Sequence, residues 1–219
     1  MKPTEVEIRD AMNLMDMLFS LGFRKAISYK KKEFEDGYKY TELGWYDWVE
    51  ENRWFHNGDI FCARGETKVC IWREDYDWVI KVAYRRETNP WYIERESTED
   101  FCELEEANYR KACAKGLERF FAAIYKIGSI DGVDIYLQER VTVDEDEISS
   151  RFDAYSLNVY GEGAECEDEE DRIEALFGRE GDALYEFVSD NDINDLHEGN
   201  WGYTDDGRIV CFDYSGYVG

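Results

Sequence analysis

The stretch that decides the fold covers residues 194–216 and reads NDLHEGNWGYTDDGRIVCFDYSG. Asp195 is followed five residues later by Asn200, and Asp213 comes thirteen residues after that. The Asp-Asp-Gly sequence at 205–207 is a turn signal between two short apolar runs, so it predicts a hairpin. Such a hairpin would fold Asp213 back toward Asn200. The sequence therefore predicts three oxygen-bearing side chains close to one another.

Phosphoryl transfer uses carboxylate and amide side chains that lie close together. The reaction needs cations to neutralise the phosphates, oxygen ligands to hold those cations, and a carboxylate beside the acceptor hydroxyl. Magnesium is bound by oxygen atoms, and carboxylate and amide side chains supply them. Asp and Asn are also common in turns and caps, so the alternative interpretation is a purely structural loop.

The segments DLHEGN (195–200) and IVCFDYSG (209–216) resemble the catalytic loop and the metal-binding motif of the protein-kinase-like fold. The form Asp-Leu-His-x-x-Asn looks most like the branch that contains aminoglycoside and choline phosphotransferases. The resemblance implies that Asp195 is the base near the acceptor. It also implies that Asp213 is the principal metal ligand and Asn200 the second one.

The same resemblance bears on four further positions. His197 stands where protein kinases carry Lys, which implies that it approaches the γ-phosphate or braces the loop. Ile193 replaces the His that usually opens the catalytic loop, and Tyr214-Ser215 replaces Phe-Gly in the metal motif.

The apolar run WVIKVAY (78–84) places Lys81 inside a predicted strand, as the kinase strand motif Val-Ala-Ile-Lys does. A Lys within a buried strand needs an ionic partner, and we expect a Glu on the following helix. Glu105 is the only acid on one helical stripe of that helix, and Glu103 is the fallback. The stripe comprises Phe101, Glu105, Asn108, Tyr109 and Ala112. The alternative interpretation makes Lys81 an edge-strand residue that extends to solvent.

Two further segments correspond to nucleotide-binding parts of the kinase-like fold. The turn ARGETKV (63–69) lies between the first two predicted strands, where kinases carry a glycine-rich loop over the phosphates. Its only glycine is Gly65, and Val69 is expected to cap the adenine. QERV (138–141) follows the fifth strand, so backbone groups of Glu139 and Val141 are expected to bind the adenine. The implied cofactors are ATP and Mg²⁺ or Mn²⁺.

Short β-rich runs at 60–63, 67–72 and 78–84 precede a helical pattern at 96–115, and two more strands, 122–128 and 133–141, meet at an Asp131-Gly132 turn. This order predicts an α+β, protein-kinase-like fold with a five-stranded antiparallel N-lobe sheet and one inserted helix. An abbreviated helical C-lobe follows, with helices near 170–178 and 181–189. The first 55 residues look helical, with a helix at 41–55. The expected domains are an N-terminal helical extension (1–57), an N-lobe (58–141) and a truncated C-lobe (142–219).

Composition narrows the possible partners. The formal net charge is −25, so direct binding of nucleic acid or an anionic membrane surface is not expected, whereas a basic protein or an aminoglycoside-like polycation suits this charge. Six cysteines without a CxxC motif and only two His residues are typical of reduced thiols and argue against a zinc site. No apolar run is long enough to cross a bilayer, and the N-terminus lacks a signal-peptide pattern. We expect a cytoplasmic protein.

Two functional hypotheses follow from the sequence. The first is a minimal kinase-like, ATP-dependent phosphotransferase whose acceptor is unidentified. Only six residues follow Asp213. We therefore expect the acceptor to be held by the N-terminal extension, by a second chain or by the acidic insert, which contains DEDE at 144–147 and ECEDEED at 165–171. The second is a pseudokinase-type binding module, or an acidic inhibitor that mimics nucleic acid, without catalysis.

Overall fold

The computed structural model describes most of the chain in two compact units. Unit 1 comprises Met1–Glu103 and Ile124–Gln138, and unit 2 comprises Leu104–Ala123 and Glu139–Gly219. We describe each unit by itself. The residues that the structure describes are 2–33, 39–52, 55, 58, 60–65, 67–85, 100–166 and 168–215.

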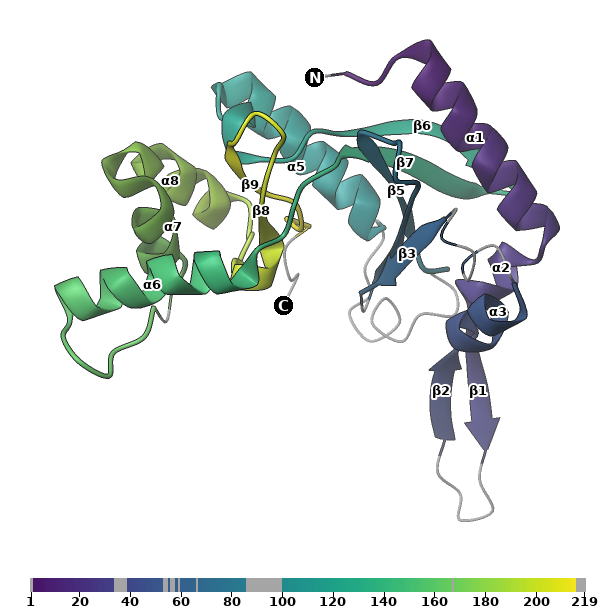
Figure 1. Ribbon diagram of the computed structural model, residues 1–219, viewed down its shortest axis with the longest axis horizontal. Coiled ribbons are helices and arrows are strands. Elements are labelled where there is room, and N and C mark those ends of the chain that lie inside the picture. Colours follow the sequence, from purple (N-terminus) through teal and green to yellow (C-terminus); the bar gives the residue numbers. More distant parts are fainter. Residues whose placement is uncertain are drawn as a thin grey trace. The chain divides into compact units, whose positions relative to one another are not determined.

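Unit 1 contains a five-stranded antiparallel sheet, as the sequence predicts, and the fold class is α+β (Figure 1). The strands lie in the order β3-β4-β5-β7-β6, so β5 is the central strand. Asp131 and Gly132 connect β6 to β7 with positive φ angles of 50° and 76°, which confirms the predicted tight turn. The strands are β3 (Phe61–Arg64), β4 (Lys68–Trp72), β5 (Trp78–Ala83), β6 (Ile124–Ile130) and β7 (Val133–Glu139).

The N-terminal helix α1 (Glu5–Ser20) packs on this sheet and lies beside β6 in Figure 1. A capping box between Thr4 and Glu7 starts the helix, and Gly22, with φ at 91°, follows its end. The apolar stripe of α1 enters the same hydrophobic core as β4, β5 and β7. Helix α1 therefore shares its core with the sheet. The core members from α1 are Ala11, Leu14, Met15 and Leu18.

The segment between the first two helical regions differs from the prediction. The sequence suggests helix throughout the first 55 residues, but β1 (Tyr29–Glu33) and β2 (Lys39–Leu43) form an antiparallel ladder. These lysine-rich strands lack the alternation of apolar and polar residues that indicates a half-buried strand. The sequence pattern therefore did not predict them. The helix expected at 41–55 is confined to α3 (Trp45–Glu51), and the short α2 (Phe23–Ala26) precedes the ladder.

The two faces of the sheet differ in character. Val69, Ile71, Ile80 and Val82 belong to the hydrophobic core that α1 completes. Because side chains alternate along a strand, the residues between them point to the opposite face. That second face carries buried polar side chains, so we call it the polar face. Its buried polar members are Lys68, Lys81, Tyr136 and Gln138, each at most 4% exposed.

Unit 2 is mainly helical and ends in a short hairpin. The two helices expected near 170–178 and 181–189 are confirmed as α7 (Glu169–Phe177) and α8 (Asp182–Asp190). Most of α5 (Phe101–Lys115) also belongs here; the expected start of that helix, at 96–99, lies outside the described residues. The short elements are the 3-10 turns η2 (Glu118–Phe120), η3 (Gly178–Gly181) and η4 (Glu198–Asn200), and strands β8 (Trp201–Tyr203) and β9 (Ile209–Cys211).

Helix α6 (Glu145–Val159) was not predicted. The Asp144 side chain accepts a hydrogen bond from the Glu147 N–H as the N-cap. Only Ile148, Phe152 and Ser156 are buried along the helix. Their spacing of four residues marks a single narrow stripe, and the surrounding acids hide it from a composition-based prediction.

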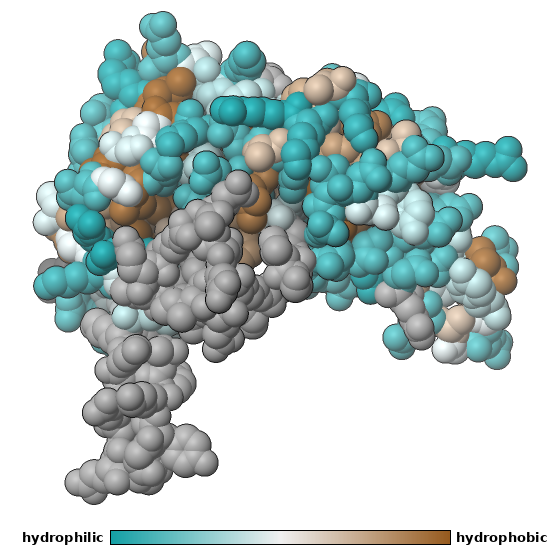
Figure 2. All heavy atoms as spheres, turned by 180° about the vertical axis from the view of Figure 1, so that it is seen from behind, coloured by the Kyte–Doolittle hydropathy of each residue, from teal (hydrophilic) through white to brown (hydrophobic). Residues whose placement is uncertain are grey.

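The visible surface in Figure 2 is predominantly hydrophilic, in keeping with 51 acidic and 26 basic residues. Among the described residues, no helix combines the length and the apolar character that crossing a membrane requires.

Candidate functional site

The loop from Ile193 to Asn200 is anchored by apolar side chains that alternate with polar ones. Ile193 and Leu196 are at most 2% exposed, so they fix the loop against the interior of unit 2. The indole Nε1 of Trp201, itself fully buried, donates to the backbone carbonyl of Leu196 at 3.0 Å. Asp195 lies between these two anchors and is partly exposed, with 39% of its side chain accessible. The anchors hold the loop while leaving the carboxylate in contact with solvent.

His197 braces this loop from within. It is the N-cap of η4, and its Nδ1 accepts a hydrogen bond from the Gly199 N–H at 3.0 Å. Because Nδ1 is the acceptor, the neutral imidazole carries its proton on Nε2, which lies 3.9 Å from Oδ1 of Asp195. A Cβ at position 199 would lie 2.9 Å from Cε1 of His197, so glycine is needed there. Of the two roles considered for His197, these contacts support bracing of the loop.

Asn200 connects the loop to itself and to the hairpin. Its side-chain Nδ2 donates to the backbone carbonyl of Asp195 at 2.6 Å. Its own backbone carbonyl accepts from the Phe212 N–H at 3.0 Å. The residue is 7% exposed, and its Nδ2 bond orients the amide oxygen away from the Asp195 carbonyl. That oxygen is the atom that a magnesium ion would require.

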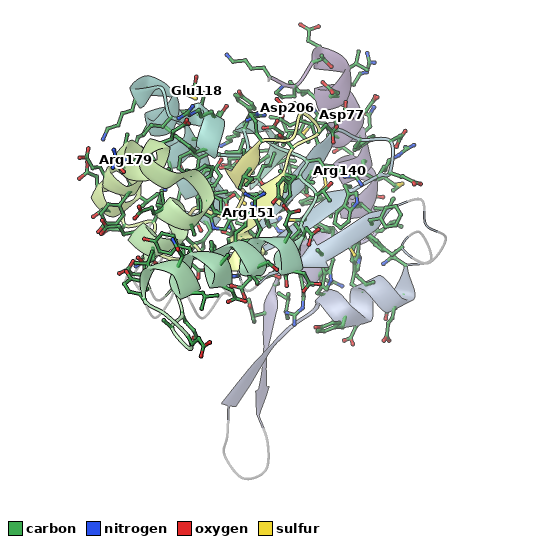
Figure 3. All side chains as sticks on the ribbon, turned by 60° about the vertical axis from the view of Figure 1, so that its left-hand side comes forward. Asp77, Glu118, Arg140, Arg151, Arg179 and Asp206 are labelled. Atoms are coloured by element: carbon green, nitrogen blue, oxygen red, sulfur yellow. The ribbon has the colours of Figure 1, made fainter. Side chains whose placement is uncertain are left out.

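The hairpin between Asn200 and Asp213 forms as predicted. Strand β8 pairs with β9 through Trp201 opposite Cys211 and Tyr203 opposite Ile209, and Figure 3 shows Asp206 at the turn. The Phe212–Asn200 hydrogen bond extends the ladder by one step, so the residue next to Asp213 is bonded to Asn200. The Cys211 thiol donates to the Asp213 carbonyl at 3.4 Å. Asp213 is partly buried beside the second predicted ligand.

Tyr214, the residue after Asp213, ties the hairpin to the rest of unit 2. Its hydroxyl donates to the Ala122 carbonyl at 2.6 Å, and its ring lies 4.9 Å from that of Phe121. Its backbone carbonyl accepts from Nδ2 of Asn108, which is 4% exposed on α5. Asn108 was recognised as a member of the helical stripe but not as a support of the site. A buried Asn on a helix face was the available signal.

The segment after β7 runs alongside the hairpin. Thr142 and Tyr203 exchange two backbone hydrogen bonds of 2.8 Å, and a Cβ at position 202 would lie 2.8 Å from Cγ2 of Val141. The Glu139 N–H donates to the Ala123 carbonyl, and the Glu139 carboxylate accepts from Arg208 at 2.8 Å. Among the described residues, none accepts from the Val141 N–H. The Glu139 N–H is thus already used within unit 2, and the adenine contacts of Glu139 and Val141 stay a prediction.

Lys81 is 2% exposed on β5, the central strand of the sheet in unit 1. This position excludes the alternative in which Lys81 extends to solvent from an edge strand. Cys70 lies directly opposite Lys81 in the ladder, so the two side chains share the polar face. Burial on a central strand is the environment in which a Lys needs an anionic partner.

Val69 lies on the other face of the sheet. It pairs with Val82 and belongs to the core beside α1, whereas Lys81 points away from that core. This placement does not fit the predicted contact between Val69 and an adenine next to Lys81. The residue of β4 on the correct face is Cys70, one position later. Strand register decides which face a residue occupies, and the sequence alone does not give that register.

Gly65 forms a closed turn before β4. Its N–H donates to the Lys68 carbonyl at 3.0 Å, and its carbonyl accepts from the hydroxyl of Tyr84 at 2.7 Å. A glycine-rich loop cradles phosphates through free backbone N–H groups. In this conformation the Gly65 N–H is not one of them.

Glu105 is fully buried on α5, whereas the fallback Glu103 is exposed. The five residues of the predicted stripe are all buried, which confirms the helical face on which Glu105 was placed. Lys81 and Glu105 belong to different units, so their ion pair stays a prediction.

Asp213 and Asn200 are the predicted metal ligands. Within the described ranges, no group of three or more His, Cys, Asp or Glu side chains could hold a metal ion. Magnesium bound with a nucleotide needs fewer protein ligands, because the phosphates supply some of the oxygens. One carboxylate at Asp213 and one amide oxygen at Asn200, joined through the Phe212 hydrogen bond, fit that requirement.

Comparison with known proteins gives no family assignment: neither a protein-family model nor a curated protein sequence matches this chain.

Proposed function

We propose that the chain is a minimal kinase-like phosphotransferase that moves the γ-phosphate of ATP to an acceptor hydroxyl. The observation that carries this proposal is the connection of Asp195, Asn200 and Asp213 through two backbone-linked hydrogen bonds. Asn200 donates to the Asp195 carbonyl, and its own carbonyl accepts from the residue before Asp213. A purely structural turn has no need to place two carboxylates and an amide oxygen on one braced scaffold.

Each residue has a distinct part in the proposed reaction. Asp195, partly exposed and held between two buried anchors, accepts the proton of the acceptor hydroxyl. Asp213 and Asn200 hold Mg²⁺ or Mn²⁺, which neutralises negative charge on the phosphates when bound. His197 keeps the loop in place through the Gly199 N–H. Lys81 and Glu105 position the phosphates in the proposal, as the resemblance implies.

The acceptor class follows from charge. A protein with a formal charge of −25 attracts cations and repels anionic macromolecules. We therefore favour a basic protein as the acceptor or binding partner.

A second candidate function is a catalytically silent, pseudokinase-type binding module or acidic inhibitor. The bonded state of Gly65 favours it, because its N–H is used within the turn and its carbonyl accepts from the Tyr84 hydroxyl. The second candidate predicts partner binding through the acidic surface without phosphate transfer.

A transfer assay separates the two candidates. Wild type is incubated with labelled ATP and Mg²⁺ or Mn²⁺, with basic protein acceptors and alone. Asp195→Asn should bind nucleotide and lose transfer, because the base is removed and the metal ligands stay. Asp205→Asn, an exposed aspartate in the hairpin turn, is the matched control and should keep wild-type transfer. Equal transfer by wild type and Asp195→Asn would refute the assigned base, and wild type that binds ATP without transfer would favour the silent module.

A further inference from the structure

Two adjoining cavities lie in unit 1 between helix α1 and the loop that connects β4 to β5. The larger one has a volume of about 800 Å³, a size that accommodates several residues of a peptide. The smaller one, of about 170 Å³, shares Asp10, Asp75 and Tyr76 with it. We call the two together the α1 pocket, which is lined by one stripe of α1 between Glu7 and Met17 and by residues 73–77 of the loop. None of the described residues that we assign to the candidate site lines it.

The floor of the α1 pocket is apolar. Leu14 and Met17 lie on the same side of α1, three residues apart, and Ile60 lies directly before β3. Leu14 is 9% exposed and Ile60 is 4% exposed, and Met17 packs partly buried against the same core. Tyr76 adds a partly buried ring from the loop. An apolar side chain that entered the pocket would therefore remove its own surface and that of the floor from water, which is favourable.

The rim of the α1 pocket is acidic. Asp10 lies on α1, and Glu74, Asp75 and Asp77 lie on the loop, all with exposed side chains. Among the described residues of the lining, Arg73 is the only base, and it donates to both carboxylate oxygens of Asp75 at 3.0 and 3.2 Å. This ion pair is neutral, so Asp10, Glu74 and Asp77 leave the rim with a net negative charge.

Two of these carboxylates are open to a ligand. Asp77 comes directly before the buried Trp78 of β5 and has no hydrogen-bond or ion-pair partner in the part of the chain that the structure describes. Figure 3 shows it beside α1, where it lines the smaller cavity together with Asp10. Asp10 has only a contact of 3.8 Å with Nε of its exposed neighbour Arg9. A cation bound between Asp10 and Asp77 would offset the repulsion of two like charges at one cavity.

The wall of the α1 pocket is held in place by hydrogen bonds within unit 1. Oε1 of Glu7 accepts from the indole Nε1 of Trp78 at 3.0 Å, which connects α1 to β5. Oε2 of Glu7 accepts from the N–H and the hydroxyl of Thr4, each at 2.6 Å. Both oxygens of Glu7 are therefore used in the structure of the wall. A preformed wall loses less conformational freedom when a ligand binds.

We propose that the α1 pocket binds a basic segment of a partner protein, with a lysine or arginine at the acidic rim and a neighbouring apolar side chain on the floor. The rim repels an acidic segment, and the floor favours a ligand that carries an apolar group beside its charge. A peptide can present both kinds of side chain, whereas a linear polyamine has no apolar branch for the floor. The inference rests on the proposed preference for a basic partner, but it needs no ATP, metal or phosphate transfer.

The test measures peptide binding to the whole chain by calorimetry, at low ionic strength and without nucleotide. The probe is the end-blocked peptide Lys-Leu-Lys-Leu-Lys, and the comparison ligands are Lys-Gly-Lys-Gly-Lys, Glu-Leu-Glu-Leu-Glu and spermine. The test variant combines Asp10→Asn with Asp77→Asn, which removes two charges and keeps the side-chain shapes. The matched control combines Asp16→Asn with Asp131→Asn, at two exposed positions of unit 1 outside the lining. Each variant is first checked for a cooperative unfolding transition.

We expect Lys-Leu-Lys-Leu-Lys to bind wild type and the control variant with similar affinity. The variant at Asp10 and Asp77 should bind it about 3- to 30-fold more weakly, because two rim charges are lost. Lys-Gly-Lys-Gly-Lys should bind wild type at least about tenfold more weakly, because nothing covers the apolar floor. Spermine should also bind more weakly than the probe, and Glu-Leu-Glu-Leu-Glu should not bind.

Equal losses in the two double variants would assign the binding to the overall charge of the protein and would overturn the inference. No binding by wild type, or equal affinity for the acidic peptide, would overturn it as well. Spermine that binds as tightly as the probe and depends equally on Asp10 and Asp77 would replace the protein segment by a small polycation. A protein that binds the probe as expected but transfers no phosphate would refute only the proposed catalysis.

Discussion

Single residues at the candidate site act mainly by orienting other residues. Asn200 uses its amide nitrogen on the Asp195 carbonyl, which leaves the amide oxygen for a metal. His197 uses Nδ1 on the Gly199 N–H, which fixes its tautomer and turns Nε2 toward Asp195. The candidate base Asp195 keeps 39% of its side chain exposed, because its neighbours provide the anchoring. A carboxylate that is exposed while its neighbours anchor the loop suits a base that must contact an acceptor molecule from solution.

Asp100 is a single residue whose environment predicts a pH effect on stability. It caps α5 by accepting from the Glu103 N–H at 2.6 Å, and burial raises its pKa to about 6. The nearby carboxylates of Glu103 and Asp134 act in the same direction, whereas the cap hydrogen bond opposes them. The folded state therefore binds a proton between pH 4 and 6 that the unfolded state has released, so this group lowers stability as pH rises through that window.

We expect Asp100→Asn to unfold with a free energy about 2 kcal/mol higher than wild type at pH 7. Asn keeps the cap and removes the buried charge. The difference between variant and wild type should shrink as pH falls from 6 to 4, measured by urea unfolding. Asp168→Asn replaces an exposed N-cap on α7 and serves as the control. An unchanged difference at pH 4 and pH 7 would contradict the account.

Individual polar supports were the least predictable part of the site. Asp195, Asn200 and Asp213 are recognisable because their spacing brackets a turn signal. Asn108 has no spacing pattern of its own, and its importance appears only when its burial and its hydrogen bond to the Tyr214 carbonyl are known. The face of Val69 was misjudged for a related reason: one residue of register moves a side chain to the other side of a sheet.

At the scale of secondary-structure elements, the β8–β9 hairpin positions the candidate ligands. It ends at Cys211, two residues before Asp213, and its first strand lies against the segment after β7. Gly202 permits this approach, because a Cβ there would lie 2.8 Å from Cγ2 of Val141 and 3.0 Å from the Thr142 carbonyl. The close backbone contact, and not a turn, is the reason for glycine at this position.

Gly202→Ala should lower the free energy of unfolding by about 1–3 kcal/mol, the usual cost of overpacking. It should also weaken metal-dependent nucleotide binding, because β8 carries the residues next to Asn200. Chemical denaturation and calorimetry measure the two effects. Gly65→Ala is the control, since its new Cβ would meet only the Lys68 carbonyl at 3.9 Å. Equal stability of the Gly202→Ala and Gly65→Ala variants would show that the approach is not tight.

Elements with strong periodicity were predicted well, and elements that rely on tertiary contacts were not. The strands β3 to β7 and the Asp131-Gly132 turn follow from apolar runs and turn chemistry. The β1–β2 ladder, rich in Lys, has no such signal. Helix α6 shows only the Ile148 and Phe152 stripe among many acids, so its length could not be inferred from composition.

At the scale of the whole molecule, the N-terminal segment is part of the fold of unit 1. Met15 and Leu18 of α1 are fully buried in the core that contains Ile71 and Ile80. Met15→Ala should destabilise unit 1 by about 2–5 kcal/mol, because a cavity replaces the side chain. Val6→Ala, at a position 54% exposed on the same helix, should change stability by less than about 0.5 kcal/mol. Similar effects of the two substitutions, compared by thermal unfolding, would mean that α1 does not contribute to the core.

The central claim is that this chain binds a metal–nucleotide complex through Asp213 and Asn200. The most direct measurement is the unfolding free energy of wild type, Asp213→Asn and Asp205→Asn with ATP, in the presence and absence of Mg²⁺. We predict that metal and ATP at a hundred times the dissociation constant stabilise wild type and Asp205→Asn by about 2.7 kcal/mol. Asp213→Asn should lose this gain, because a formal charge is removed from the metal site. An equal gain in Asp213→Asn, or no gain in wild type at millimolar ATP with Mg²⁺ or Mn²⁺, would contradict the claim.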